Sequence, residues 1–109
     1  MLFRSPKPVD KTFPLAPDVT IDNNLSNRYT VLEVSGLDRP GLLFDLTAAL
    51  SRLNLNIGSA HIATFGEKAV DVFYVTDLTG LKITATGRQG TIRKALLEIF
   101  EPPKAAPKR

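Results

Sequence analysis

The sequence contains no cysteine, no tryptophan and a single histidine. Without cysteine, the chain has no disulfide, no thiolate metal ligand and no cysteine nucleophile. With one histidine as the remaining nitrogen ligand, a structural zinc site is not expected. No apolar run approaches the roughly 20 residues of a membrane helix, and residues 1–8 lack the apolar core of a signal peptide. These absences favour a reducing, cytoplasmic compartment and argue against a membrane partner.

Proline and glycine are unevenly distributed. Seven of the eight prolines lie in residues 1–17 and 102–109, whereas all seven glycines lie between those segments. Proline-rich stretches without an apolar period are typical of extended linkers. We therefore predict one domain at residues 18–101, with a proline-rich linker at 1–17 and a basic, proline-rich tail at 102–109. A linker of this length suggests that the domain is joined to something upstream.

The net charge of +3 belongs to the tails. The linker carries three basic and one acidic side chain (+2), and the tail carries three basic side chains (+3). Residues 18–101 hold the remaining 8 basic and 10 acidic side chains (−2). A nucleic-acid partner would require a basic patch on the folded part, so no nucleic-acid partner is expected.

Apolar spacing and turn residues predict the element order β-β-α-β-β-α. Strands are expected at residues 19–22 and 29–35 around a turn cluster at 23–27, and again at 55–65 and 69–76 around a hairpin turn at 66–68. On residues 55–65, alternation places Leu55, Ile57 and Phe65 on one face. On residues 69–76, both faces are apolar, which is typical of a central strand or of a face that meets a partner.

Two helices are expected. A stripe of leucines at helical spacing predicts the first, with Pro40 in its first turn: Leu43, Leu46, Leu50 and Leu53. The second is predicted by another apolar stripe: Ile92, Ala95, Leu96 and Ile99. Thr86-x-x-Gln89 has the form of a capping box before this helix, residues 81–83 form a brief extension ahead of it, and Pro102-Pro103 ends it.

The order β-α-β-β-α is that of a ferredoxin-like plait without its last strand. In the full plait, the last strand lies antiparallel beside the first. The extra strand at 19–22, joined to 29–35 by a hairpin, fits that place. We predict an α+β two-layer sandwich with a four-stranded antiparallel sheet and two helices on one face, in which an N-terminal strand replaces the usual last one.

The loop before the first helix is a candidate anion site. Gly41 has no side chain, so a ligand can approach the backbone there. A helix start carries unpaired N–H groups and partial positive charge, which favour a carboxylate or phosphate. A Pro-Gly loop that binds only water has the same pattern, and the residues of this stretch alone favour that ordinary reading.

Two long sequence segments resemble a known protein family. LDRPGLLFDLTAAL (37–50) and LNLNIGSAHIATFGEKAVDVFYVTD (53–77) resemble the ACT domain, a small regulatory module that binds amino acids. The resemblance covers nearly all of residues 29–101. It is strongest to the C-terminal ACT domains of the bifunctional uridylyltransferase/uridylyl-removing enzymes, which modify the nitrogen signal protein PII.

The resemblance implies a role in nitrogen-status signalling. In that enzyme family, tandem C-terminal ACT domains sense glutamine and switch a nucleotidyltransferase domain and an HD hydrolase domain, which are expected to need a divalent metal such as Mg²⁺. This chain has no HD dipeptide and no Gly-Ser loop followed by spaced aspartates. The resemblance therefore implies a regulatory fragment without catalysis or a cofactor of its own. It implies two partners, an amino acid and either a second copy or a neighbouring ACT domain.

The resemblance also implies the site. ACT ligands usually sit between the first strand–helix loop and the second strand, often at an interface between subunits or repeats. The matching residues here are Asp38, Arg39, Gly41, Leu42 and Leu43, facing Asn56, Ile57, Ala60 and His61. Amides at 41–43 would hold the α-carboxylate, Asp38 would pair with the α-ammonium, and Asn56 would bind a side-chain amide.

Each assignment has a structural alternative. Asp38 can cap the loop or pair with Arg39, which is otherwise expected in solvent. Asn56 fits a turn after the helix, and His61 fits a structural strand position. Phe44 fits either a partner contact or, preferably, a peripheral core position.

Three other functions fit parts of the sequence. An acylphosphatase-like enzyme would use Arg39 and Asn56, but the loop lacks a glycine-rich cradle and Pro40 removes a donor. Nucleic-acid binding on the sheet would need adjacent aromatic residues and a basic face, whereas Tyr29 and Tyr74 are scattered in the sequence. An ACT domain from another parent, such as a stringent-response synthetase or an ACT-repeat protein, stays open.

Overall fold

The structure is a computed structural model that describes residues 16–101. Nearly all of the predicted linker and the whole predicted tail lie outside the described residues, so the domain boundaries stay predictions. The element order is the predicted one. The elements are β1 (Asp18–Asp22), β2 (Thr30–Leu37), α1 (Leu42–Arg52), β3 (Leu55–Phe65), β4 (Lys68–Asp77) and α2 (Thr86–Ile99).

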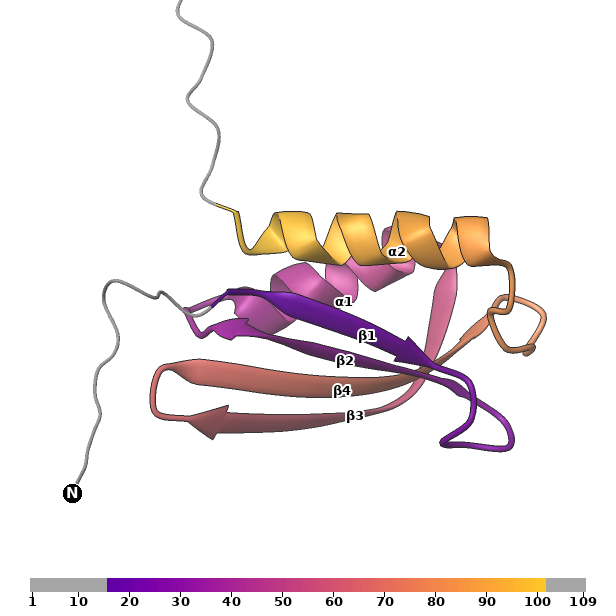
Figure 1. The fold of residues 1–109 in the computed structure, drawn as a ribbon, viewed down its shortest axis with the longest axis horizontal. Helices are drawn as coiled ribbons and strands as arrows, with labels where there is room; N and C mark the ends of the chain where they lie inside the picture. The colour runs from indigo at the N-terminus through magenta and orange to yellow at the C-terminus, as the bar shows by residue number, and fades with distance from the viewer. Residues whose placement is uncertain (1–15, 102–109) are drawn as a thin grey trace, which may run out of the picture.

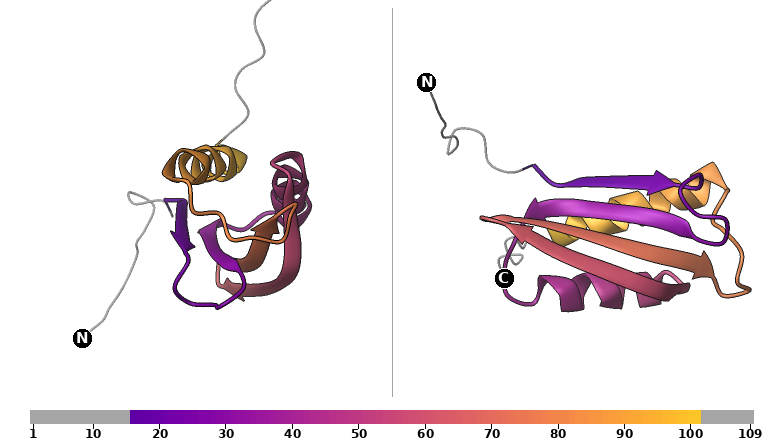
Figure 2. Two further views of the ribbon diagram at one scale, coloured as in Figure 1. Left: turned by 90° about the vertical axis from the view of Figure 1, so that its right-hand side faces the viewer. Right: turned by 90° about the horizontal axis from the view of Figure 1, so that it is seen from below.

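The four strands form one antiparallel sheet in the order β1-β2-β4-β3. β1 pairs with β2 in the place of the missing last strand. Both helices lie on the same face of the sheet, with α2 on the β1 side and α1 on the β3 side (Figures 1 and 2). The predicted ferredoxin-like α+β sandwich is confirmed.

The core lies between the sheet and the helices. Directly paired residues of antiparallel strands point to the same side, so Leu32 and Phe73 share the helix-facing side of β2 and β4. The helices close this core with apolar residues that recur at helical spacing: Leu42, Leu46, Ala49 and Leu50 from α1, and Ile92 and Leu96 from α2. The predicted stripes are correct except at one position.

That position is Leu43, which is 42% exposed, whereas Leu42 is 2% exposed. Gly41 has a left-handed backbone (φ 80°) and is the N-cap of α1, so Pro40 precedes the helix and does not lie in its first turn. Because the helix begins at Leu42, the side chain of Leu42 faces the core and that of Leu43 faces away from it. The prediction of Phe44 as a peripheral core residue is also wrong, because its side chain is 73% exposed.

A β-bulge changes the faces of β3. The pairing of β3 with β4 shifts between Ile57 and Ser59, which leaves Gly58 as the extra residue. Ile57 pairs with Val75 on the helix-facing side, and Phe65 pairs with Lys68 on the other. The prediction that Ile57 and Phe65 share a face is therefore wrong.

The entry to α2 also differs from the prediction. The N-cap is Ala85, and no side chain caps the helix within the described chain. The predicted capping box does not form, because Thr86 is already helical and the side-chain Nε2 of Gln89 donates to the carbonyl of Ile83 at 2.8 Å. The expected extension at 81–83 is irregular, and the hairpin turn is shorter than expected because Lys68 belongs to β4.

Candidate functional site

The loop between β2 and α1 exposes the start of the helix. The amide of Leu42 donates to the carbonyl of Arg39 (3.2 Å), and that of Asp45 donates to Gly41 (3.0 Å). Leu43 and Phe44 lie between them, at positions whose amides cannot find a partner inside the helix. No side-chain cap is present among the described residues. The partial positive charge of α1 is therefore open to an anion.

Arg39 holds this loop in place. Its Nη2 lies 2.7 Å from Oδ2 of Asp45 and donates to the carbonyl of Ile99 at 3.2 Å. The first contact fixes the loop to α1, and the second fixes it to the last turn of α2. Arg39 is therefore not simply a solvated side chain, and its partner is Asp45, not Asp38. Because both charged side chains are about two-fifths exposed, the pair contributes at most about 1 kcal/mol.

Two carboxylates lie at the same end of the sheet. The amide of Asp38 donates to the carbonyl of Glu67 at 2.8 Å, which joins the loop to the β3–β4 turn. Asp71 lies on β4 and is 2% exposed, and its Oδ1 has no hydrogen-bond partner in the described structure. Burial, followed by the nearby charge of Asp38, raises the pKa of the Asp71 carboxyl.

Asp71 is not among the site residues predicted from the sequence. A signal was present: along β4, Asp71 has the same phase as Ala69, Phe73 and Val75, whose side chains form the core. A lone acid in the buried phase of a strand is unusual because a buried charge needs a partner.

Asn56 and Ile57 line a separate pocket at the start of β3. The pocket has a volume of about 230 Å³ and is lined by Arg28, Tyr29, Asn56, Ile57, Gly58, Thr76 and Gly80. The ring of Tyr29 packs on the bulge, since a Cβ on Gly58 would lie 2.5 Å from Tyr29 Cε1. Asn56 Nδ2 donates weakly to the carbonyl of Asp77 at 3.5 Å.

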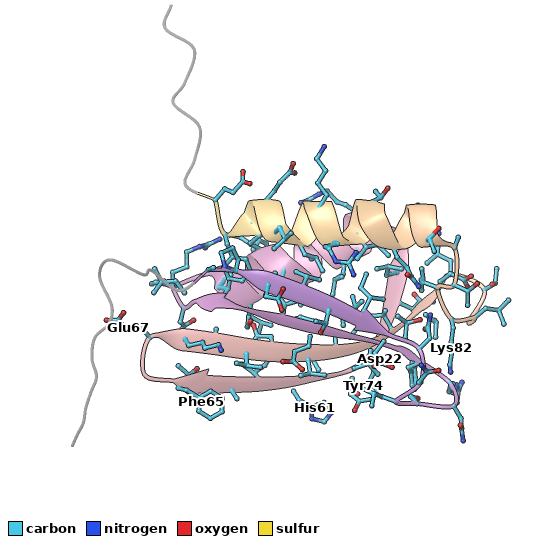
Figure 3. All side chains as sticks on the ribbon, in the orientation of Figure 1. Asp22, His61, Phe65, Glu67, Tyr74 and Lys82 are labelled. Atoms are coloured by element: carbon cyan, nitrogen blue, oxygen red, sulfur yellow. The ribbon has the colours of Figure 1, made fainter. Side chains whose placement is uncertain are left out.

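Ala60 and His61 point to opposite faces of the sheet. Ala60 pairs with Phe73 on the helix-facing side, and His61 pairs with Val72 on the open face. Figure 3 shows His61, Tyr74 and Phe65 on the face away from the helices. The rings of His61 and Tyr74 lie 5.5 Å apart and nearly perpendicular, and Tyr29 lies 6.1 Å from Tyr74.

The tyrosines that are scattered in the sequence are therefore adjacent in space. They meet edge to face, however, and do not form the flat stacking platform that single-stranded nucleic acid uses. The β1–β2 half of the same face carries carboxylates: Asp18, Asp22 and Glu33.

One copy of the chain does not bring the predicted site residues together. Leu37 pairs with Lys68, and Lys68 pairs with Phe65. The loop at 38–41, which comes directly after Leu37, therefore lies near the C-terminal end of β3. Asn56 is nine residues back along β3, a distance of about 30 Å in an extended strand. The first group, Asp38 to Leu43, and the second, Asn56 and Ile57, thus lie at opposite ends of the sheet. The Arg39–Asn56 pairing of the acylphosphatase alternative is not formed.

Residues 16–101 contain neither a metal-binding cluster nor a membrane-spanning helix. No group of three or more His, Asp or Glu side chains in this part is placed to hold a metal ion. None of its helices is long and apolar enough to cross a membrane.

The chain is similar to known proteins over most of its length. The ACT domain family model matches residues 30–86. The chain is 61% identical over 98 residues to the bifunctional uridylyltransferase/uridylyl-removing enzyme of Rhodopseudomonas palustris, covering 90% of the chain and 10% of that protein. It is 61% identical over 95 residues to the enzyme of the same name from Bradyrhizobium diazoefficiens, covering 87% and 10%.

The chain thus spans about a tenth of the length of these relatives. A crystal structure of an unknown protein from Galdieria sulphuraria has a similar fold, with a TM-score of 0.52 and 21% identity over 73% of this chain and 48% of that one. This last likeness shows the fold alone.

Proposed function

The chain belongs to the ACT domain family, and from this premise we propose that it is the glutamine-sensing domain of a bifunctional uridylyltransferase/uridylyl-removing enzyme. The observation that carries the proposal is the identity of about 61% to enzymes of this name over nearly the whole domain. This identity favours such a parent over a stringent-response synthetase or an ACT-repeat protein. In the cytoplasm, the parent would modify PII according to nitrogen status, with a divalent metal in its catalytic domains.

The start of α1 supports amino-acid binding. Free amides at Leu43 and Phe44 suit an α-carboxylate, and Asp38, in the loop three residues before the N-cap Gly41, brings a negative charge for an α-ammonium. A zwitterion presents these two charges together. The binding residues proposed here are the predicted ones, Asp38, Arg39, Gly41, Leu42 and Leu43, completed by the β3 residues of a second copy or a neighbouring ACT domain.

The geometry of β3 supports a binding site that a second copy completes. β3 is an eleven-residue edge strand paired on one side only, and an unpaired edge is a template for another strand. If two copies pair antiparallel about the middle residue, Ala60, the second copy's Asn56 lies opposite residue 64 of the first. The second copy's Asn56 and Ile57 then stand next to the 38–43 loop, so the interface joins the two groups that one copy separates.

Ligand binding at such an interface explains regulation. A ligand shared by two ACT domains binds one arrangement of the pair more tightly than another, and it shifts the population toward that arrangement. The catalytic domains of the parent would respond to the arrangement. Nothing in the proposal requires this chain to perform chemistry.

Calorimetric titration with L-glutamine tests the proposal, with L-glutamate and D-glutamine as controls and light scattering to measure the oligomeric state. We expect saturable, stereospecific binding of L-glutamine by a dimer, weakened by Asp38→Ala. If neither this chain nor a tandem pair of ACT domains binds L-glutamine at millimolar concentration, glutamine sensing is wrong. Binding by a strict monomer would contradict completion of the site by a second copy.

A further inference from the structure

Asp71 is a buried carboxylate with one unpaired oxygen in the described structure. It is 2% exposed, its Oδ1 is unpaired within the described structure, and it points into the helix-facing side of the sheet. Its cross-strand neighbours are Val34 and Ile62, and Ala69 and Phe73 flank it along the same face. None of these side chains offers a hydrogen bond. A buried carboxylate in such surroundings is costly unless a cation or a donor reaches it.

The carboxylate lies beside the loop that precedes α1. Asp38 is close enough for its charge to act on Asp71, and it is three residues before the N-cap, Gly41. Asp38 therefore brings a negative charge to the loop before the positive end of an uncapped helix of eleven residues, within range of the charge of Asp71. This combination presents separate places for a cationic and an anionic group at one site.

Within residues 16–101, no ion pair joins Asp71 to a basic side chain. Arg39 is engaged by Asp45 and by the carbonyl of Ile99. β3 contains no lysine or arginine over residues 55–65, so a second copy that docks along this edge brings none. Its one histidine, His61, faces the open side of the sheet. Neither of these side chains, among the described residues, is placed to pair with Asp71, which leaves room for the cation of a small ligand.

We propose that Asp71, together with Asp38, binds the α-ammonium of an amino acid whose α-carboxylate lies at the first amides of α1. This inference rests on the proposed function and adds to it the residue that selects an amino acid over other carboxylic acids. An ammonium has three donors and no acceptor, which suits one buried and one exposed carboxylate. A ligand that lacks the ammonium leaves Asp71 unpaired and binds more weakly.

The ligand has a route to this position. Ile62, the cross-strand neighbour of Asp71 on the same face, is 49% exposed, and Ile57 is 39% exposed. Thr64, farther along that side, is also exposed. The helix-facing side of β3 beyond Leu55 is thus open to solvent, and an ammonium entering along this edge reaches Asp71 without unfolding the sheet.

The test compares L-glutamine with its 2-hydroxy analogue, in which a hydroxyl replaces the amine. The full chain is titrated calorimetrically as the natural protein, as Asp71→Asn and as Glu33→Gln. Glu33→Gln is the matched control, because it removes one charge from an exposed position on the opposite face of the same sheet. We expect the natural protein and the control to prefer L-glutamine by about 10- to 100-fold, the usual worth of a charge-assisted hydrogen bond. In Asp71→Asn, this preference should largely disappear.

The outcomes separate the two proposals. If the natural protein binds neither compound, the proposed function fails. If it binds L-glutamine and Asp71→Asn keeps the full preference, the function stands and this inference is overturned. If Asp71→Asn does not fold, carboxyl-carbon NMR of the natural protein decides, because a bound ammonium must lower the pKa of Asp71. A titration of Asp71 that L-glutamine leaves unchanged would overturn the inference.

Discussion

Adding one methyl group at Gly36 should destabilise the domain by forcing the end of α2 away from the sheet. A Cβ at this position would lie 2.6 Å from Cε1 and 2.7 Å from Cδ1 of Phe100. Carbon atoms pack at about 3.5–4.0 Å, so the ring must move by roughly 1 Å. Overpacking of this kind costs about 1–3 kcal/mol, and about 0.5–1 kcal/mol is regained because alanine suits a strand interior better than glycine.

We therefore expect Gly36→Ala to lower the free energy of unfolding by about 1–2 kcal/mol. For a domain of this size, the melting temperature should fall by roughly 5–15 °C. Thermal and urea unfolding followed by circular dichroism measure both quantities. Gly87→Ala is the control, because its Cβ meets open space and alanine favours a helix.

The cause is tested by combining Gly36→Ala with Phe100→Ala. Removing the ring abolishes the clash, so the double variant should be more stable than the sum of the two single effects predicts, by about 1 kcal/mol or more. Strictly additive effects would refute the reasoning, because they would show that the cost at Gly36 does not come from Phe100.

Three further predictions concern the loop and the two perturbed carboxyl groups. Gly41→Ala should lower stability by about 1–2 kcal/mol through its left-handed backbone alone, because its Cβ would meet only Arg39 Nη1 at 3.8 Å; urea unfolding measures this, and an unchanged midpoint would contradict it. Since the pKa of Asp71 is raised in the folded state, stability should fall as pH rises from about 4 through that pKa, and Asp71→Asn should flatten this part of the profile. Since hydrogen bonds from Thr79 and Leu81 lower the pKa of Asp77, its contribution should be present above about pH 4 and lost as pH falls through the folded pKa; the same pH series on Asp77→Asn tests this.

The architecture was predictable because local signals agree with one another. Turn residues separate apolar runs of strand length, two leucine- and isoleucine-rich stretches have helical spacing, and the hairpin at the N-terminus fits the vacant sheet position. The errors arise where one backbone angle or one extra residue changes which residues of a helix or strand face the core. Gly41 shifts the start of α1 by its left-handed conformation, and the bulge at Gly58 turns Phe65 to the other face.

The candidate site was only partly predictable. Loop chemistry indicated the start of α1, and the family resemblance indicated Asn56. The loop before α1 and Asn56 lie at opposite ends of the sheet because of the strand register, which no local sequence pattern predicts. Asp71 was missed for a related reason: its burial depends on which face of β4 the helices cover. The contact between Tyr29 and Tyr74 likewise depends on how two strands align.

Supplying the fourth strand from the N-terminal side changes where the chain enters and leaves the domain. β1 begins opposite Ser35, and α2 ends where Phe100 packs on Gly36. Figure 1 shows the start of β1 and the end of α2 on the same side of the domain. A plait with its usual last strand would begin and end at the opposite end of the strands, near Thr30. Here both covalent connections begin within a short distance of the 38–41 loop. A ligand that moves that loop would therefore act close to both ends of the domain at once, and its effect would not have to cross the core.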